Sequence, residues 1–267
     1  MRINRIIALS LLAGASFAAQ AHKSWLLPSA TVLTPDQWIT VDAAVSNDLF
    51  VFNHVPVKLD KLVVTAPDGS RAEPANPHTG KFRSSFDLHL TQKGTYRIAV
   101  ANEGVFASYE LDGKKQRWRG DAAGLAAAIP ATATAVEITE GISRNETFVT
   151  SGAPTTSTFK TSGKGLEMVP TTHPNDLFSG EKATFQLFLD GKPAADLPVT
   201  IVPGGSRYRD TQAEISAKTD DKGQFSVSWP APGMYWLEAE VEDKKTTVAK
   251  AAGRRTSYTA TLEVLPQ

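Results

Sequence analysis

Cysteine is absent from this sequence of 267 residues. Disulfide bonds, thiolate metal ligands and cysteine nucleophiles are therefore all excluded. A chain without disulfides depends on its hydrophobic core, and the 41% of apolar residues is enough to build one. We therefore expect a folded protein rather than a disordered one.

An excess of either charge is also missing, since Lys plus Arg and Asp plus Glu each number 28. Without a basic excess there is little to attract a phosphate backbone, so we expect no nucleic-acid partner. The sequence has no G-x-S-x-G, no H-E-x-x-H and no phosphate-binding loop, so we expect no enzymatic activity.

Long apolar runs are confined to the first residues, which have the form of a signal peptide. Arg2 and Arg5 precede a short apolar segment at 6–19, and Ala19-Gln20-Ala21 is a typical cleavage site. We predict that residues 1–21 are removed on export to the periplasm. No later stretch approaches the ~18 apolar residues of a membrane span, so we expect no membrane insertion after cleavage.

Short segments with β-strand character make up most of the remaining chain. They alternate or are rich in β-branched residues, and turn-forming Gly, Pro, Asn and Asp separate them. The first group lies at 38–45, 61–67, 86–90, 94–102 and 106–111. The second group lies at 166–170, 182–191, 198–204, 213–229, 233–243 and 257–265. We predict an all-β fold with two β-sandwich domains, residues 22–150 and 166–267, the second immunoglobulin-like.

Two stretches interrupt the strand pattern. Within 116–129, Asp121 can cap a short alanine-rich helix that Pro130 would end. Residues 151–165 are rich in Gly, Ser and Thr, which is typical of a linker between the two domains.

The predicted cleavage leaves His22 as the first residue of the mature chain. An N-terminal histidine offers its α-amine and its ring Nδ1 to the same cation, and a metal displaces the proton of a free α-amine with only modest cost at neutral pH. Nitrogen ligands of this kind favour Cu(II) or Ni(II). The alternative is coincidence, because some residue must follow the cleavage site.

A second ligand is needed for a useful metal site, and His54 is the first candidate. It lies in a predicted loop near Asp48 and Asn53. His89 would face solvent from a strand, His78 lies in a turn, and His173 would have to be recruited at a domain interface.

Two further sets of residues have a structural and a binding interpretation. Trp25, Trp38, Trp229 and Trp236 are expected in hydrophobic cores, with a sugar-stacking platform as the alternative. The Gly-rich stretch 203–210, which carries two arginines, is expected to be a solvated loop, with anion binding as the alternative.

Several segments resemble one bacterial periplasmic family, catalogued as domain of unknown function 4198 and associated with nickel uptake. They are HKSWLLPS (22–29), SNDLFVFNHVP (46–56), LEMVPTTHPNDLFSGE (166–181), DGKPAADLPVTIVPGG (190–205) and KTDDKGQFSVSWPAPGMYWLEAE (218–240). The resemblance implies an all-β periplasmic protein that takes part in transition-metal uptake, with His22 as a metal ligand.

The sequence therefore predicts a periplasmic protein that binds Ni(II) or Cu(II) through His22 and His54 and supports metal uptake or delivery. An inner- or outer-membrane metal transporter is the expected partner. The alternative is a structural or adhesive β-sandwich module that binds a protein or a glycan. An oxidase with a copper site is a third interpretation, for which the sequence offers no substrate groove.

Overall fold

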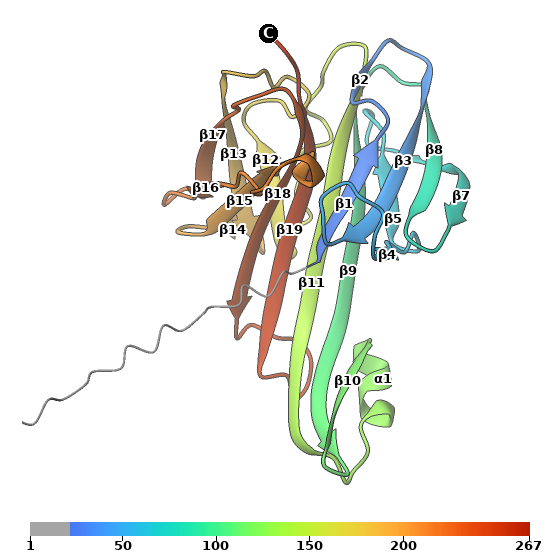
Figure 1. Ribbon diagram of the computed structural model, residues 1–267, viewed down its shortest axis with the longest axis vertical. Coiled ribbons are helices and arrows are strands. Elements are labelled where there is room, and N and C mark those ends of the chain that lie inside the picture. The colour runs from blue at the N-terminus through green and yellow to red at the C-terminus, as the bar shows by residue number, and fades with distance from the viewer. Residues whose placement is uncertain (1–21) are drawn as a thin grey trace, which may run out of the picture.

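The computed structural model describes residues 22–267, and the predicted signal peptide at 1–21 lies outside the described residues. Strands form three sheets, accompanied by the α-helix α1 (Ala122–Ala128) and a 3-10 turn, η1 (Ser206–Tyr208) (Figure 1). The predicted all-β class, with its short helix in the N-terminal half, is confirmed.

A five-stranded sheet forms the outer layer of the N-terminal sandwich. Its order is β1-β3-β8-β7, and β4 also pairs with β3. The strands are β1 (Lys23–Pro28), β3 (Gln37–Ser46), β4 (Val55–Pro56), β7 (Ala75–Thr79) and β8 (Ser84–Leu90).

A four-stranded sheet forms the outer layer of the C-terminal sandwich. Its order is β12-β13-β14, and β17 also pairs with β13. The strands are β12 (Leu166–Pro170), β13 (Lys182–Leu189), β14 (Lys192–Pro193) and β17 (Gln224–Ser228).

A ten-stranded sheet is common to both sandwiches. Its order is β16-β15-β18-β19-β11-β9-β5-β6, while β10 pairs with β9 and β2 pairs with β11. Its first strands are β2 (Val32–Leu33), β5 (Leu62–Thr65), β6 (Arg71–Ala72), β9 (Gly94–Leu111) and β10 (Lys114–Gly120). Its later strands are β11 (Thr134–Ser151), β15 (Pro198–Pro203), β16 (Ile215–Lys218), β18 (Gly233–Asp243) and β19 (Gly253–Val264).

Strand β11 supplies side chains to both hydrophobic cores. Phe148 belongs to the C-terminal core and the next residue, Val149, belongs to the N-terminal core. Successive side chains of a strand point to opposite faces, so the two outer sheets cover opposite faces of the ten-stranded sheet. Figure 1 shows them on the two sides of β9, β11 and β19.

The N-terminal core follows from simple alternation along β3 and β8. On β8 the apolar residues Phe86, Leu88 and Leu90 are buried, as predicted, while Asp87 and His89 lie on the solvent side. On β3, Ile39 is buried but Trp38 points the other way and is 56% exposed. The prediction that Trp38 packs in a core is therefore wrong, because strand register places it on the solvent side of the sheet.

The other three tryptophans predicted in cores are buried. Trp229 lies in the C-terminal core, while Trp25 and Trp236 share a smaller cluster between the two sandwiches. The Trp236 indole N–H donates to the carbonyl of Ser24 at 2.8 Å, which joins β18 to β1.

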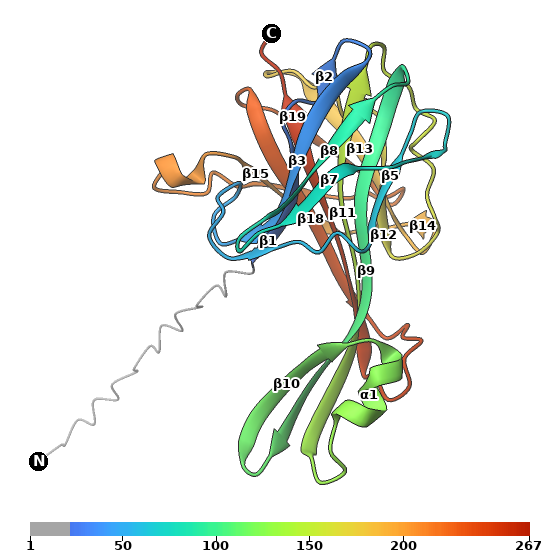
Figure 2. The same ribbon diagram turned by 90° about the vertical axis from the view of Figure 1, so that its right-hand side faces the viewer.

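The lower ends of β9 and β11 extend beyond both sandwiches as an arm, together with β10 and α1 (Figure 2). The predicted helix is present, and Asp121 caps it by accepting a hydrogen bond from the N–H of Gly124 at 2.7 Å. Leu125 is its buried residue and packs with Val105 and Ile138. In the described part of the chain, no helix is both long enough and apolar enough to cross a bilayer.

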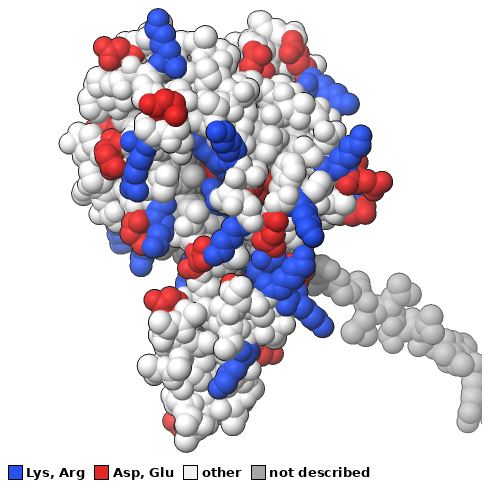
Figure 3. Space-filling model, turned by 180° about the vertical axis from the view of Figure 1, so that it is seen from behind, with Lys and Arg blue, Asp and Glu red and all other residues white. Residues whose placement is uncertain are grey.

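Charged side chains of both signs are interspersed over the sandwiches on the face shown in Figure 3, and few are visible on this face of the arm. No single-sign patch dominates this face. This distribution agrees with the balanced composition of the chain.

The segment between β11 and β12 is packed against the ten-stranded sheet rather than free in solvent. Phe159 is buried, and the Thr158 hydroxyl donates to the carbonyl of Thr95 at 3.2 Å. The Arg97 guanidinium donates to the carbonyl of Lys160 at 2.8 Å. These contacts hold residues 152–165, which we call the crossing segment, against β9.

A buried ionic cluster lies beneath this crossing segment. Glu146 is fully buried and accepts hydrogen bonds from Arg97 Nε at 2.7 Å, from Arg144 Nη1 at 3.1 Å and from the Tyr258 hydroxyl at 3.1 Å. Glu167, also fully buried, accepts from the backbone N–H groups of residues 162 and 163, both at 2.8 Å. The cluster thus joins β9, β11, β12 and β19.

We expect the substitution Glu146→Gln to lower the free energy of unfolding by about 3–5 kcal/mol, because it removes the carboxylate nearest to the buried Arg97 guanidinium and leaves Glu167 as its remaining counter-charge. Urea denaturation measures the change. Glu103→Gln is the matched control, since Glu103 also pairs with a cation, Lys164, but on the exposed surface. The control should change stability by less than about 1 kcal/mol; equal effects of the two substitutions would contradict a structural role for the buried cluster.

Candidate functional site

His22 and His54, 32 positions apart in the sequence, are stacked face to face in the structure. Their ring centroids lie 3.8 Å apart and their planes differ by 1°. Strand β3 explains the encounter, because β1 pairs with it on one side and β4 on the other. Lys23 lies opposite Ser46 and Val55 opposite Val45, so the residues that precede β1 and β4 both reach the same end of β3.

The loop that carries His54 is fixed by its own side chains. Asn53 accepts a hydrogen bond from the N–H of Asn47 at 3.0 Å and donates to the Asp48 carboxylate at 3.1 Å. Phe50 and Phe52 pack against the Trp25 ring, each with a centroid separation of 5.5 Å. The position of His54 therefore depends on a cluster that also contains a residue of β1.

The stacked arrangement presents ring faces to each other, whereas a metal is bound by nitrogen atoms at the ring edge. His22 is exposed and His54 is half-buried, so rotation of the His22 side chain meets little packing resistance. Within residues 22–267, no group of three or more His, Asp or Glu side chains is placed to hold a metal. Side chains alone thus supply at most this pair, and further ligands must come from the backbone, the α-amine or solvent.

Lys23, the neighbour of His22, has its ammonium 5.9 Å from the centroid of the Trp236 ring. On the adjoining β18, burial and then the nearby Glu240 charge raise the pKa of Glu238, while Lys23 opposes this rise. Lys23 is therefore engaged with groups of β18.

The remaining histidines do not join the pair. His89 stacks on Trp38 and its Nε2 lies 2.8 Å from a carboxylate oxygen of Asp36. His78 is exposed, but it lies on strand β7 opposite Ser85, so the prediction that it lies in a turn is wrong.

His173 lies at the junction of the two sandwiches and is held by hydrogen bonds. Its Nδ1 accepts from the N–H of Asn175 at 3.1 Å, and its Nε2 donates to the carbonyl of Thr155 at 3.2 Å. Both ring nitrogens are thus used in holding the neutral ring. Burial is the main reason that the pKa of His173 is lowered, while the hydrogen bond to Thr155 opposes the change.

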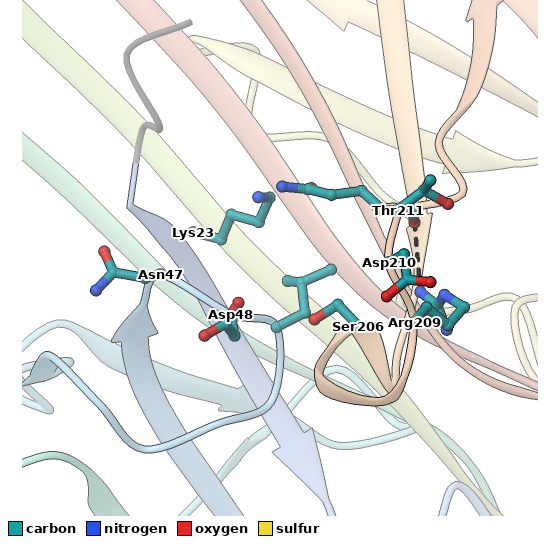
Figure 4. A pocket seen from close by; sticks show the side chains of 9 residues that line it. Lys23, Asn47, Asp48, Ser206, Arg209, Asp210 and Thr211 are labelled. Carbon is teal, nitrogen blue, oxygen red and sulfur yellow. Dashed lines mark hydrogen bonds between the residues drawn. The ribbon is translucent and has the colours of Figure 1, made fainter.

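A pocket of about 180 Å³ lies between the start of β1 and the loop that contains η1 (Figure 4). Asp48 and Ser206 approach it from opposite sides, one from each sandwich. Arg209 lines it too, but its guanidinium donates to the carbonyls of Gly204 at 2.6 Å and Pro203 at 2.8 Å. Arg209 therefore holds the shape of its own loop, which explains an arginine there without an anionic ligand.

Comparison with known proteins identifies one family. The model of a family described as "Domain of unknown function (DUF4198)" matches residues 19–243. No curated protein matches the chain.

The solved structures to which this chain is similar are remote in sequence. The D0-D1 domain of intimin is 14% identical, with a TM-score of 0.24, over 90% of this chain and 97% of that one. The Yersinia pseudotuberculosis adhesin InvE is 13% identical, with a TM-score of 0.22, over 92% of this chain and 61% of that one. The titin I-band fragment I67-I69 is 10% identical, with a TM-score of 0.21, over 93% and 67%.

We expect the half-buried, neutral His173 to make folding stability depend on pH. In the unfolded chain its pKa is close to 6.5, and in the folded protein it is lower. The unfolded state therefore binds more protons below about pH 6.5, so the contribution of His173 to stability is lost as the pH falls through that range.

Urea denaturation of the native chain and of His173→Gln between neutral and acidic pH measures this contribution. The difference in unfolding free energy between the two should shrink as the pH falls. His78→Gln, at an exposed position, should show no such change. A constant difference for His173→Gln across the range would contradict the prediction.

Proposed function

Because the chain belongs to the DUF4198 family, whose description assigns no activity, we propose a function from the site itself: binding of a transition-metal ion in the bacterial cell envelope, in support of metal uptake or delivery. The observation that carries the proposal is the contact between His22 and His54, with ring centroids 3.8 Å apart. Chance proximity of two of the five histidines is the competing explanation.

Signal-peptide cleavage after Ala21 would complete the site. It would create an α-amine on His22, and this amine and the ring Nδ1 can close a chelate on one ion. A nitrogen of His54 would be the third ligand, within reach after a rotation of the exposed His22 side chain. Imidazole and amine nitrogens suit Cu(II) or Ni(II) better than Mg²⁺ or Ca²⁺.

The proposed ligand set suits transport rather than permanent storage. Three nitrogen ligands leave coordination positions for water or for a ligand from another protein. His22 lies on the surface, so an acceptor can approach the ion directly. A membrane metal transporter is the partner that this exposure and the predicted export favour.

We expect the chain that begins at His22 to bind one Cu(II) or Ni(II) ion in a calorimetric titration. A flexible Gly/Ser extension ahead of His22 moves the amine away from the ring and should weaken binding at least about tenfold. His54→Ala should also weaken binding at least about tenfold, through loss of one imidazole ligand. Electron paramagnetic resonance of the Cu(II) form should show fewer coupled nitrogens in each variant.

His78→Ala is the matched control, because it removes an exposed histidine from the same sandwich. It should bind the ion as the native chain does. Unchanged binding by the extended chain would show that the α-amine is not a ligand. Unchanged binding by His54→Ala would show that His54 is not a ligand. Either result would overturn the proposed ligand set.

A further inference from the structure

The solvent face of the five-stranded sheet carries a row of side chains that the proposed metal site does not use. We call it the outer strip and define it by the outward positions of β3 and β8 and by Arg83 in the turn of the β7–β8 hairpin. Its members are Trp38, Thr40, Asp42, Arg83, Ser85, Asp87 and His89. In Figure 2 the sheet that bears them lies toward the viewer.

An exposed indole lies at one end of the outer strip. Trp38 is 56% exposed, and its ring is parallel to that of His89, with centroids 4.5 Å apart and planes differing by 6°. His89 is fixed in turn by Asp36, whose carboxylate oxygen lies 2.8 Å from Nε2. The indole is thus supported on one face by a second ring and keeps more than half of its surface in contact with solvent.

Hydrogen-bonding groups follow Trp38 along the same face. Thr40 lies opposite Asp87, and its hydroxyl donates to the Asp87 carboxylate at 2.7 Å. Asn76 of β7 donates to the other oxygen of that carboxylate at 2.9 Å. These bonds lower the pKa of Asp87, the one from Asn76 having the largest effect. Asp87 therefore remains a charged hydrogen-bond acceptor.

A hollow of about 450 Å³ lies at the other end of the outer strip. Phe52, Phe82, Arg83 and Ser85 are among the residues that line it. The Arg83 guanidinium lies 4.4 Å from the centroid of the Phe52 ring and pairs with Asp42 at 3.3 Å. Flat aromatic surface and fixed polar groups thus occur together here as well.

The length and charge of the outer strip restrict what it can bind. From His89 to Arg83 the strand rises by on the order of 20 Å, which is the span of several sugar rings rather than one. Asp42 is paired with Arg83, and the Asp36 and Asp87 carboxylates are hydrogen-bonded to His89, Thr40 and Asn76, so the face has no excess of positive charge and no cluster of exposed charges without partners. A neutral ligand fits this face better than a polyanion or polycation.

A peptide strand is a poor candidate for the same face. Both β3 and β8 are already paired on each side, so neither offers a free edge for strand addition. Pyranose rings instead combine apolar faces, which stack on aromatic rings, with hydroxyl groups that bond to Asp, Asn and Arg.

We propose that the outer strip binds a neutral, extended oligosaccharide, with one sugar ring stacked on Trp38 and the chain running toward the hollow near Arg83. The outer strip follows the direction of β8, and such a row of side chains suits an extended β-1,4-linked chain better than a curved α-1,4-linked one. The side chains of the outer strip are not ligands of the proposed metal site, so the two proposals are independent. The proposal names a class of sugar for the glycan-binding alternative that the sequence left open.

The experiment titrates cellotetraose, N,N′,N″,N‴-tetraacetylchitotetraose and maltotetraose into the full chain from His22 and measures heat. We expect at least one of the two β-linked sugars to bind with a dissociation constant below about 1 mM, and more tightly than maltotetraose. Trp38→Ala should weaken that binding at least about tenfold, by analogy with the loss of one aromatic stacking contact. Asp87→Ala should also weaken it.

Tyr208→Ala is the matched control, because Tyr208 is an aromatic residue that is 87% exposed on the other sandwich. It should leave the affinity unchanged, and circular dichroism should show that all the variants are folded. Absence of binding by both β-linked sugars, or equal affinity of the native chain and Trp38→Ala, would overturn the proposal. Equal binding of maltotetraose would overturn the choice of an extended chain.

Discussion

The structure depends on β11, which must satisfy two hydrophobic cores at once. Because neighbouring side chains of a strand point to opposite faces, Phe148 and Val149 anchor different outer sheets to one central sheet. The two sandwiches therefore cannot move independently of each other unless β11 separates from the strands that pair with it. Two residues before Phe148 on the same strand, Glu146 joins two arginines and a tyrosine beneath the segment between β11 and β12.

This shared sheet also explains where the two candidate binding sites lie. The five-stranded sheet buries one face against β9 and β5 and turns the other to solvent, which creates the outer strip. Its end beside β18 brings together the start of β1 and the loop before β4, and there His22 meets His54. One small sheet thus presents a histidine pair at its end and a polar, aromatic surface along its length.

Local sequence features predicted much of this architecture. Alternation along 86–90 identified the buried and solvent-facing sides of β8, and Asp121 identified the start of the helix. The same reasoning was wrong for Trp38, since residue type favours burial of tryptophan while strand register decides its direction. The ionic cluster around Glu146 had no local signal, because its members come from four strands that only the fold brings together.

The sequence by itself determined the absence of thiol chemistry, the balance of charge, the β-strand segments and the two histidines that flank the first strands. These properties depend on residue identity and on spacing along the chain. Only the tertiary structure decided that the sandwiches share one sheet, that His22 stacks on His54 and that Trp38 faces solvent. These outcomes depend on which distant strands pair and in which register, and a pattern read along one strand carries no record of its partner.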